Sequence, residues 1–225
     1  MMAVGEFAVI KDSWRGIAVN YLVPPKDSVY AKGVFGNTPE MLTFYSDVLG
    51  YDYPWDKYNQ IVVSDYVSGA MENTGAVIHG KWVFTTPEQQ IDEHHEDVVA
   101  HELFHHWFGD FVTAESWSNI TVNESFADYS QTLWFEHSQG KDAGAFENYT
   151  GLRSYLSSPS DAEKHLVRFF YQNQEDVFDL VSYQKGGRIL NMLRHLVGDD
   201  AFFASLNKYL TDNKFSNGSA IKLKL

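Results

Sequence analysis

The chain has 225 residues, 44% of them hydrophobic and 16% aromatic, which is the composition of a folded globular protein with one sizeable core. Its formal net charge of −13, with no basic patch apart from Lys222-Leu223-Lys224, argues against a nucleic-acid-binding surface. The lack of cysteine excludes disulfides and thiolate metal sites, and no apolar run is long enough to span a membrane.

Strand signals fill the chain up to about residue 85. Short segments rich in β-branched and aromatic residues, bounded by turn residues, indicate strands. One helix interrupts them, from Thr38 as N-cap to Gly50, with Pro39 in its first turn. The expected strands are residues 6–10, 16–23 and 60–66, followed by 76–79 and 81–84, which are expected to form a hairpin through Gly80.

Helical patterns dominate from Thr86 onward. Gly140 and Gly198 suit helix ends. This segregation predicts an α+β fold, with a sheet-bearing subdomain at 1–85 and a helical subdomain at 86–225. The expected helices are residues 91–108, 122–137, 143–156, 183–196 and 200–210.

The first of these helices contains His101-Glu102-Leu103-Phe104-His105, an H-E-x-x-H motif. Residues four apart lie on one face of a helix, so both imidazoles can reach one ion, with Glu102 beside them. Catalytic zinc takes three protein ligands and leaves a position for water. The motif therefore predicts one zinc ion per chain and a third ligand elsewhere, although an isolated match also arises by chance.

Glu124, on the following helix, is the candidate for the third ligand. The metzincin arrangement would require a glycine at Phe108 and a histidine at Phe111, so it is excluded. A carboxylate from the next helix is the remaining common solution. Thr121 and Glu124 also fit a capping box, in which the glutamate would only satisfy a backbone amide.

Four motifs, which follow one another along the chain in the order found in the family, resemble the aminopeptidase N family of zinc metallopeptidases. Leukotriene epoxide hydrolase also belongs to that family. The similarity extends over roughly residues 4–210. It implies a thermolysin-like catalytic domain, with zinc between a sheet-bearing half and a helical half. The motifs are Gly69-Ala70-Met71-Glu72-Asn73, the H-E-x-x-H segment continued through His106-Trp107-Phe108-Gly109-Asp110, Asn123-Glu124-Ser125-Phe126-Ala127, and Tyr183-Gln184-Lys185-Gly186-Gly187.

The resemblance implies that residues 1–225 form a single catalytic domain. Family members also have an N-terminal β-domain and a C-terminal helical region, and neither is expected within these residues. In the family the β-domain adds a residue that holds the substrate amine. We therefore expect a catalytic-domain fragment whose substrate recognition is incomplete.

The resemblance also implies roles for particular residues. His101, His105 and Glu124 hold zinc, Glu102 is the general base, and Tyr183 stabilises the oxyanion. Without the other motifs, Tyr183 would be read as a core tyrosine.

The Gly69-Ala70-Met71-Glu72-Asn73 segment is the expected substrate-binding strand. Glu72 binds the α-amine of the substrate, and Gly69 and Ala70 offer backbone groups to it. The segment would otherwise suit a plain loop between strands.

Asp128, one turn after Glu124, is expected to orient one of the zinc-bound histidines. Many relatives have a glutamate seven residues after the third ligand, where this chain has Gln131. The remaining histidines are expected to be surface or packing residues. They are His79, His94, His95, His106, His137, His165 and His195.

Together these features predict a zinc-dependent aminopeptidase that hydrolyses the N-terminal bond of peptides with a free amine. One alternative is a zinc-binding structural or regulatory module without turnover. Another is an epoxide hydrolase on the same zinc site, which would need a lipid tunnel that the sequence does not show.

Overall fold

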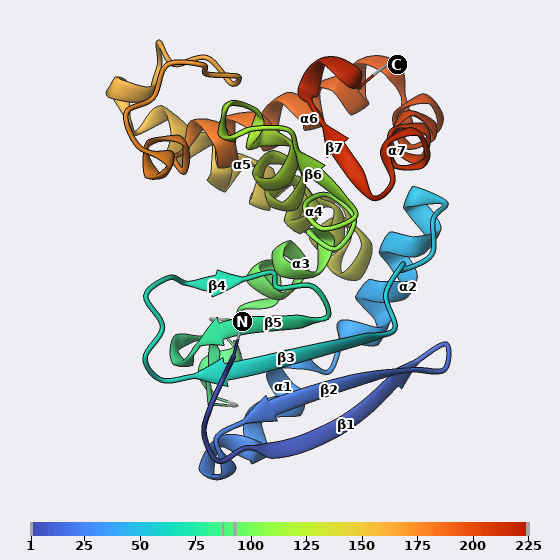
Figure 1. Cartoon of the computed structure of the whole chain (residues 1–225), viewed down its shortest axis with the longest axis vertical. Coiled ribbons are helices and arrows are strands. Elements are labelled where there is room, and N and C mark those ends of the chain that lie inside the picture. Colours follow the sequence, from blue (N-terminus) through green and yellow to red (C-terminus); the bar gives the residue numbers. More distant parts are fainter. Residues whose placement is uncertain (1, 87, 92–93, 224–225) are drawn as a thin grey trace.

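The protein consists of a part built on a mixed β-sheet and a part built almost wholly of helices (Figure 1). Its structure is a computed structural model that describes residues 2–86, 88–91 and 94–223. The α+β class predicted from the sequence is confirmed. The segregation is not complete, because a small sheet of β6 (Val112–Ala114) and β7 (Ser216–Gly218) lies in the helical part.

The large sheet has five strands in the order β1-β2-β3-β5-β4. β2 pairs parallel with β3, and β3 with β5, whereas the two edge strands run antiparallel to their neighbours. β4 is therefore an edge strand, and Figure 1 shows it on the side of the sheet nearest the helical part. The strands are β1 (Ala8–Trp14), β2 (Ile17–Val23), β3 (Lys57–Val63), β4 (Ala70–Met71) and β5 (Ala76–Gly80).

A tight hairpin joins β1 to β2. Its two turn residues, Arg15 and Gly16, have φ angles of 43° and 88°. Two successive residues with positive φ match the right-handed twist of the flanking strands. β1 therefore extends to Trp14, and the prediction that this strand spans residues 6–10 was wrong.

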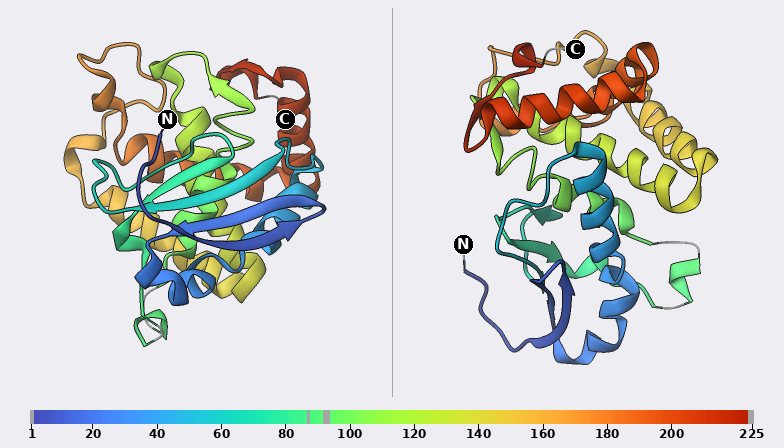
Figure 2. Two further views of the ribbon diagram at one scale, coloured as in Figure 1. Left: turned by 60° about the horizontal axis from the view of Figure 1, so that its bottom comes forward. Right: turned by 90° about the vertical axis from the view of Figure 1, so that its right-hand side faces the viewer.

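Two helices lie along one face of the sheet (Figure 2). They are α1 (Ala31–Phe35) and α2 (Thr38–Leu49), and α2 ends at Gly50 as predicted. Alternate residues of β2 are fully buried on this side, and the ring of Tyr21 stacks on Phe35 at 5.5 Å. Apolar burial at every second strand position therefore holds the helices against the sheet.

The predicted hairpin through Gly80 is wrong. β5 ends at Gly80, and Lys81–Val83 form a 3-10 turn instead of a strand. The indole of Trp82 folds back, donates its Nε1–H to the carbonyl of Gly69 at 3.0 Å, and lies 2.7 Å from the position a Gly80 Cβ would occupy. β5 thus pairs with β3 and β4, and not with the residues that follow it.

The helical part surrounds α4, which contacts α3, α5 and α6. Its fully buried aromatic side chains include Phe104, Trp107 and Trp134. Every helix in the described residues is too short or too polar to cross a lipid bilayer. The helices are α3 (Glu96–Phe104), α4 (Thr121–Gln139), α5 (Lys141–Leu156), α6 (Gly186–Val197) and α7 (Asp199–Asn213), with a π-helical turn at Val181–Lys185 before α6.

α3 is shorter than the helix predicted over residues 91–108. Ile91 belongs to a separate 3-10 turn, and Asp92 and Glu93 lie outside the described residues. At the other end the chain turns back at Gly109, where φ is +151°, and the amide of Asp110 donates to the carbonyl of His105 at 2.9 Å. This turn requires a glycine, because a Cβ at residue 109 would lie 2.9 Å from that same carbonyl oxygen.

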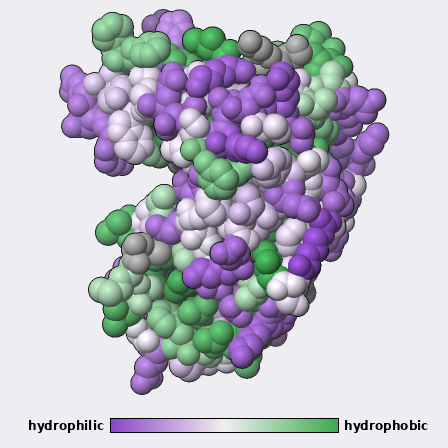
Figure 3. Space-filling view, turned by 45° about the vertical axis from the view of Figure 1, so that its right-hand side comes forward, coloured by the Kyte–Doolittle hydropathy of each residue, from purple (hydrophilic) through white to green (hydrophobic). Residues whose placement is uncertain are grey.

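One core joins the two parts. The phenol of Tyr45 on α2 donates to the carbonyl of Ser130 on α4 at 2.9 Å, and its ring packs edge-on against Phe104. On one side of the molecule the two parts are separated by a notch (Figure 3). The sheet and the helices therefore form one packed body that is hollowed at the junction.

Candidate active site

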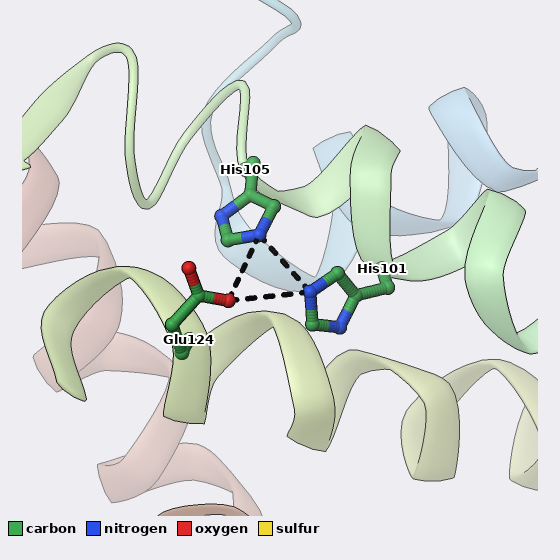
Figure 4. A group of neighbouring side chains, drawn as sticks. All are labelled: His101, His105 and Glu124. Atoms are coloured by element: carbon green, nitrogen blue, oxygen red, sulfur yellow. Dashed lines mark hydrogen bonds and ion pairs between the residues drawn. The ribbon is translucent and has the colours of Figure 1, made fainter. Parts of the chain in front are cut away.

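The side chains of His101, His105 and Glu124 converge between α3 and α4 (Figure 4). The Nε2 atoms of the two histidines are 3.1 Å apart, and Glu124 Oε2 lies 3.4 Å from each. All three residues are buried. The structure therefore brings the three predicted metal ligands to one point.

The two histidines keep helical spacing although α3 ends before His105. His105 has φ −56° and ψ −23°, so it continues the helical backbone by one more residue. Its imidazole consequently lies one turn along from that of His101, as an i, i+4 pair requires. The shorter helix does not disturb the motif.

The capping-box reading of Glu124 is wrong. Thr121 is already inside α4, the N-cap is Ile120, and no side chain caps this helix end. The hydroxyl of Thr121 contacts that of Ser125 instead. The carboxylate of Glu124 is thus directed to the histidines.

The donor set fits a zinc ion. Two imidazole nitrogens and one carboxylate oxygen are the ligands of many catalytic zinc sites. Nδ1–H of His105 donates to the carbonyl of Phe108 at 3.1 Å, a bond that leaves Nε2 as the ring nitrogen that a metal would bind. Glu124 Oε2 is buried and, within the described part of the chain, is in no hydrogen bond. A cation would satisfy it.

The charges around the site also favour a cation. Burial by itself would lower the pKa of His105, but the carboxylates of Glu72 and Glu124 outweigh it and hold that pKa well above its ordinary value. The pocket therefore stabilises positive charge, which a metal ion would supply in place of the proton.

Glu102 lies on α3 between the two histidines and is buried. Burial raises its pKa to about 7, against the lowering effect of the histidines. Its Oε2 has no hydrogen-bond partner among the residues that the structure describes. A carboxylate with a pKa near neutrality and a free oxygen is suited to general base catalysis.

The predicted substrate-binding strand lies beside the ligands. Glu72 follows β4, and its Oε1 is 3.9 Å from Nδ1 of His105. The carbonyl of Gly69 is satisfied inside the sheet, by the amide of Gly80 and the indole of Trp82. Because hydrogen bonding alternates along an antiparallel pair, the next residue, Ala70, directs its backbone groups toward the open edge.

The buried side chain of His106 connects this strand to α3. Its Nδ1–H donates to the carbonyl of Glu102 at 3.2 Å, and its Nε2 accepts the amide of Gly75 at 2.9 Å. Burial lowers the pKa of His106 to about 3, so the ring is neutral and can do both. His106 is thus a packing residue, as predicted, and it fixes the loop that follows Glu72 against the helix that carries Glu102.

Tyr183 lies on the π-helical turn before α6. Its ring stacks on His101 with the centroids 5.9 Å apart and the planes 12° from parallel. Burial and the nearby carboxylate of Glu124 raise its pKa above the ordinary value, so the phenol keeps its proton. It can therefore donate a hydrogen bond in the metal pocket, and single turns of π-helix often occur at such sites.

The prediction for Asp128 is corrected by its contacts. Its carboxylate accepts from Arg188 at 3.1 Å and from Gln184 at 3.2 Å. Gly187 allows this approach, since a Cβ there would lie 2.3 Å from Asp128 Oδ2. Asp128 therefore ties α4 to α6 and to the π-helical turn.

The partner of His101 is Gln131, whose amide lies 3.1 Å from Nδ1. An amide can present either its nitrogen or its oxygen to a ring. With the oxygen toward Nδ1–H, it would leave Nε2 unprotonated, as a metal ligand must be. The spacing in the sequence could have indicated this contact, because residues 124 and 131 are two turns apart and lie on one face of α4.

Comparison with known proteins gives one consistent result. A sequence profile of the Peptidase family M1 domain matches residues 34–224. The chain is 32% identical to aminopeptidase 2 of Candida albicans over 95% of its own length and 24% of that protein. It is also 32% identical to aminopeptidase N of Streptomyces lividans, over 83% of this chain and 23% of the relative.

A solved structure agrees with the sequence matches. The crystal structure of the E323A mutant of an M1 zinc metallopeptidase from Deinococcus radiodurans matches 97% of this chain with a TM-score of 0.76 and 26% identity. The match covers 47% of that protein. The chain thus spans about a quarter of the length of the curated relatives and about half of the solved chain.

Proposed function

Because this chain belongs to peptidase family M1, we propose that it is a zinc-dependent aminopeptidase that hydrolyses the N-terminal bond of peptides. The observation that carries the proposal is the position of Glu72, 3.9 Å from a metal ligand. A carboxylate there can hold the cationic amine of a substrate. The first peptide bond would then lie at the metal pocket.

His101, His105 and Glu124 are the residues that would hold zinc. A bound zinc ion would polarise the scissile carbonyl and lower the pKa of water. The solved structure that this chain resembles supports the assignment, since that protein is a zinc metallopeptidase.

In the proposed reaction Glu102 takes a proton from the attacking water as the water oxygen bonds to the carbonyl carbon. The carbon–nitrogen bond then breaks, and Glu102 returns the proton to the leaving nitrogen. The phenol of Tyr183 donates a hydrogen bond to the oxyanion of the tetrahedral intermediate. Its raised pKa keeps that hydrogen in place.

The edge of β4 supports a peptide as the substrate. An extended chain can add to an open sheet edge through main-chain hydrogen bonds, and Ala70 directs its backbone groups to that edge. Met71, the last residue of β4, and Asn73 flank Glu72 along the chain. We propose this edge as the binding place of the first residues of the substrate.

We also assign residues 1–225 to one thermolysin-like catalytic domain, with a sheet-bearing part at 1–85 and a helical part at 86–225. The continuous core supports this, since α2 packs on both the sheet and α4. The metal ligands come from the helical part, and Glu72 comes from the sheet part. A complete site therefore needs both parts.

Replacing Glu72 by glutamine tests the aminopeptidase assignment. The substitution removes the charge that pairs with the substrate amine, and a hydrogen bond between charged groups contributes about 1.5–3 kcal/mol. We expect kcat/KM for alanyl and leucyl p-nitroanilides to fall about 10- to 100-fold. The measurement is steady-state kinetics on the zinc-loaded chain, with the N-acetylated substrates in parallel.

The control is Glu40→Gln, which changes an exposed carboxylate on α2 and is expected to leave kcat/KM unchanged. The unmodified chain should not cleave the N-acetylated substrates. Equal cleavage of free and acetylated substrates would contradict the proposed role of Glu72 and the aminopeptidase assignment with it.

A further inference from the structure

We propose that Asp179, clamped by Arg168, is a positioning residue for Tyr183: its carboxylate fixes the π-helical turn that carries the phenol. The inference rests on the proposed function, because Tyr183 matters for the rate only if it stabilises the oxyanion. The inference adds the ion pair of Arg168 and Asp179 to the residues on which the reaction depends.

Asp179 caps the start of the turn. Its Oδ1 accepts the backbone amides of Val181 at 3.1 Å and Ser182 at 3.2 Å. Its own carbonyl accepts the amide of Tyr183 at 3.1 Å. The first amides of a helical turn have no carbonyl partner within the helix. Asp179 alone therefore satisfies the amides of Val181, Ser182 and Tyr183.

Arg168 holds the carboxylate in place. Its guanidinium forms two parallel hydrogen bonds to Asp179, of 2.6 and 3.0 Å, and Lys164 adds a third at 2.9 Å. Burial would raise the pKa of Asp179, but these cations outweigh it and hold the pKa below its ordinary value. Bidentate pairing fixes orientation as well as distance, so the cap is rigid.

The same guanidinium also contacts the turn itself. Nη2 of Arg168 donates to the hydroxyl of Ser182 at 2.8 Å and to the carbonyl of Val177 at 3.1 Å. The side chains of Arg168 and Asp179 are only 12% and 16% exposed. Both Nη atoms of Arg168 are hydrogen-bonded in this buried pair, which makes the pair costly to break.

The opposite side of the turn is attached to α4. The hydroxyl of Ser125, next to the metal ligand Glu124, donates to the carbonyl of Ser182 at 2.6 Å. Gly186 permits the contact, since a Cβ there would lie 1.8 Å from Ser125 Oγ. Ser182, the neighbour of Tyr183, is therefore held from both sides, and the phenol is placed relative to Glu124.

A π-helical turn needs such support. The amide of Lys185 donates to the carbonyl of Leu180 at 2.9 Å, five residues back, which is a wider ring than that of an α-helix. π-helices are rare because this geometry is unfavourable by itself. Without the cap the turn can tighten into an α-helix, which would rotate Tyr183 away from His101.

The test is Asp179→Asn in the whole chain. The amide removes the charge and one of the two acceptor oxygens. We expect kcat to fall at least about 10-fold with KM changed less than about twofold, because a small misplacement of a catalytic group costs rate and not ground-state binding. The double variant Asp179→Asn/Tyr183→Phe should be no slower than Tyr183→Phe alone.

A second readout does not depend on turnover. In the metal-free protein, hydrogen exchange at the amides of Val181 and Ser182 should become faster in Asp179→Asn, while α4 amides keep their rates. Asp176→Asn is the control, since the carboxylate of Asp176 also accepts two backbone amides, those of Gln172 and Asn173, outside the π-helical turn. It should leave kcat and the exchange of the turn unchanged. Arg168→Lys keeps the charge and loses the bidentate geometry, so its loss of kcat should be smaller than that of Asp179→Asn.

Unchanged exchange of Val181 and Ser182 in Asp179→Asn would overturn the inference, as would rate losses that multiply in the double variant. If Tyr183→Phe is slow and Asp179→Asn is not, only this inference fails. If Tyr183→Phe itself retains full kcat, the role of Tyr183 in the proposed function fails as well.

Discussion

Replacing Glu102 by glutamine is expected to lower kcat for aminoacyl substrates by about 10²- to 10⁴-fold, the usual contribution of a general acid–base group. Glutamine keeps the size of the side chain and cannot take a proton. Because Glu102 is not one of the three residues that converge on the candidate metal position, the metal content should not change. The check is a parallel measurement of kcat and of zinc per chain by atomic emission.

Glu96→Gln is a matched control on the same helix. The carboxylate of Glu96 accepts from Asn37 and from the indole of Trp134, both at 2.7 Å, so its loss should lower stability without lowering turnover per folded chain. A Glu102→Gln variant with one zinc per chain and near-normal kcat would show that another group acts as the base.

Replacing Glu124 by alanine is expected to weaken zinc binding by more than about 100-fold, which is the upper end of what outer hydrogen-bond partners of metal ligands contribute. It removes one of three ligands and the carboxylate that attracts positive charge into the pocket. Competition with a chromophoric chelator measures the affinity. Turnover should be lost at zinc concentrations that saturate the unmodified chain.

Asp128→Asn is the control for this variant, one turn away on the same helix. Because Asp128 contacts Arg188 and Gln184, we expect zinc affinity within about threefold of normal, well below the effect of a ligand partner. Full zinc affinity in Glu124→Ala would contradict the assignment of the third ligand.

The convergence of His101, His105 and Glu124 could be predicted because the geometry is local. Two histidines four residues apart share a helix face whether or not the helix continues, and His105 keeps helical angles after α3 ends. Glu124 could be predicted because a second helix was expected to start near it. The depth of burial that raises the pKa of Glu102 to about 7 depends on the packing of both parts, so no local pattern predicts it.

The partner of His101 could have been predicted from helical geometry. Seven residues bring a side chain back to within about 20° of its starting direction, whereas four residues leave it about 40° away on the other side. Gln131 therefore shares the face of Glu124, and Asp128 is turned toward α6. The direction of a side chain around the helix, and not its distance from Glu124 along the sequence, therefore identifies the partner of His101.

Other features depend on distant contacts that local patterns do not contain. The strand at 76–80 pairs with β3 and β4, which are distant or separated from it by a turn. The local pattern instead favours pairing with the apolar residues 81–84 that follow Gly80. The π-helical turn around Tyr183 is supported by Arg168, Asp179 and Ser125, and its residues look like the start of an ordinary helix.

The most direct test of the proposed function is the zinc content of the purified chain, measured together with hydrolysis of alanyl and leucyl amides before and after chelation. The proposal predicts one zinc per chain, turnover that chelator abolishes, and recovery when zinc is added back. A chain that binds no zinc, or that hydrolyses these substrates equally well after chelation, would contradict it.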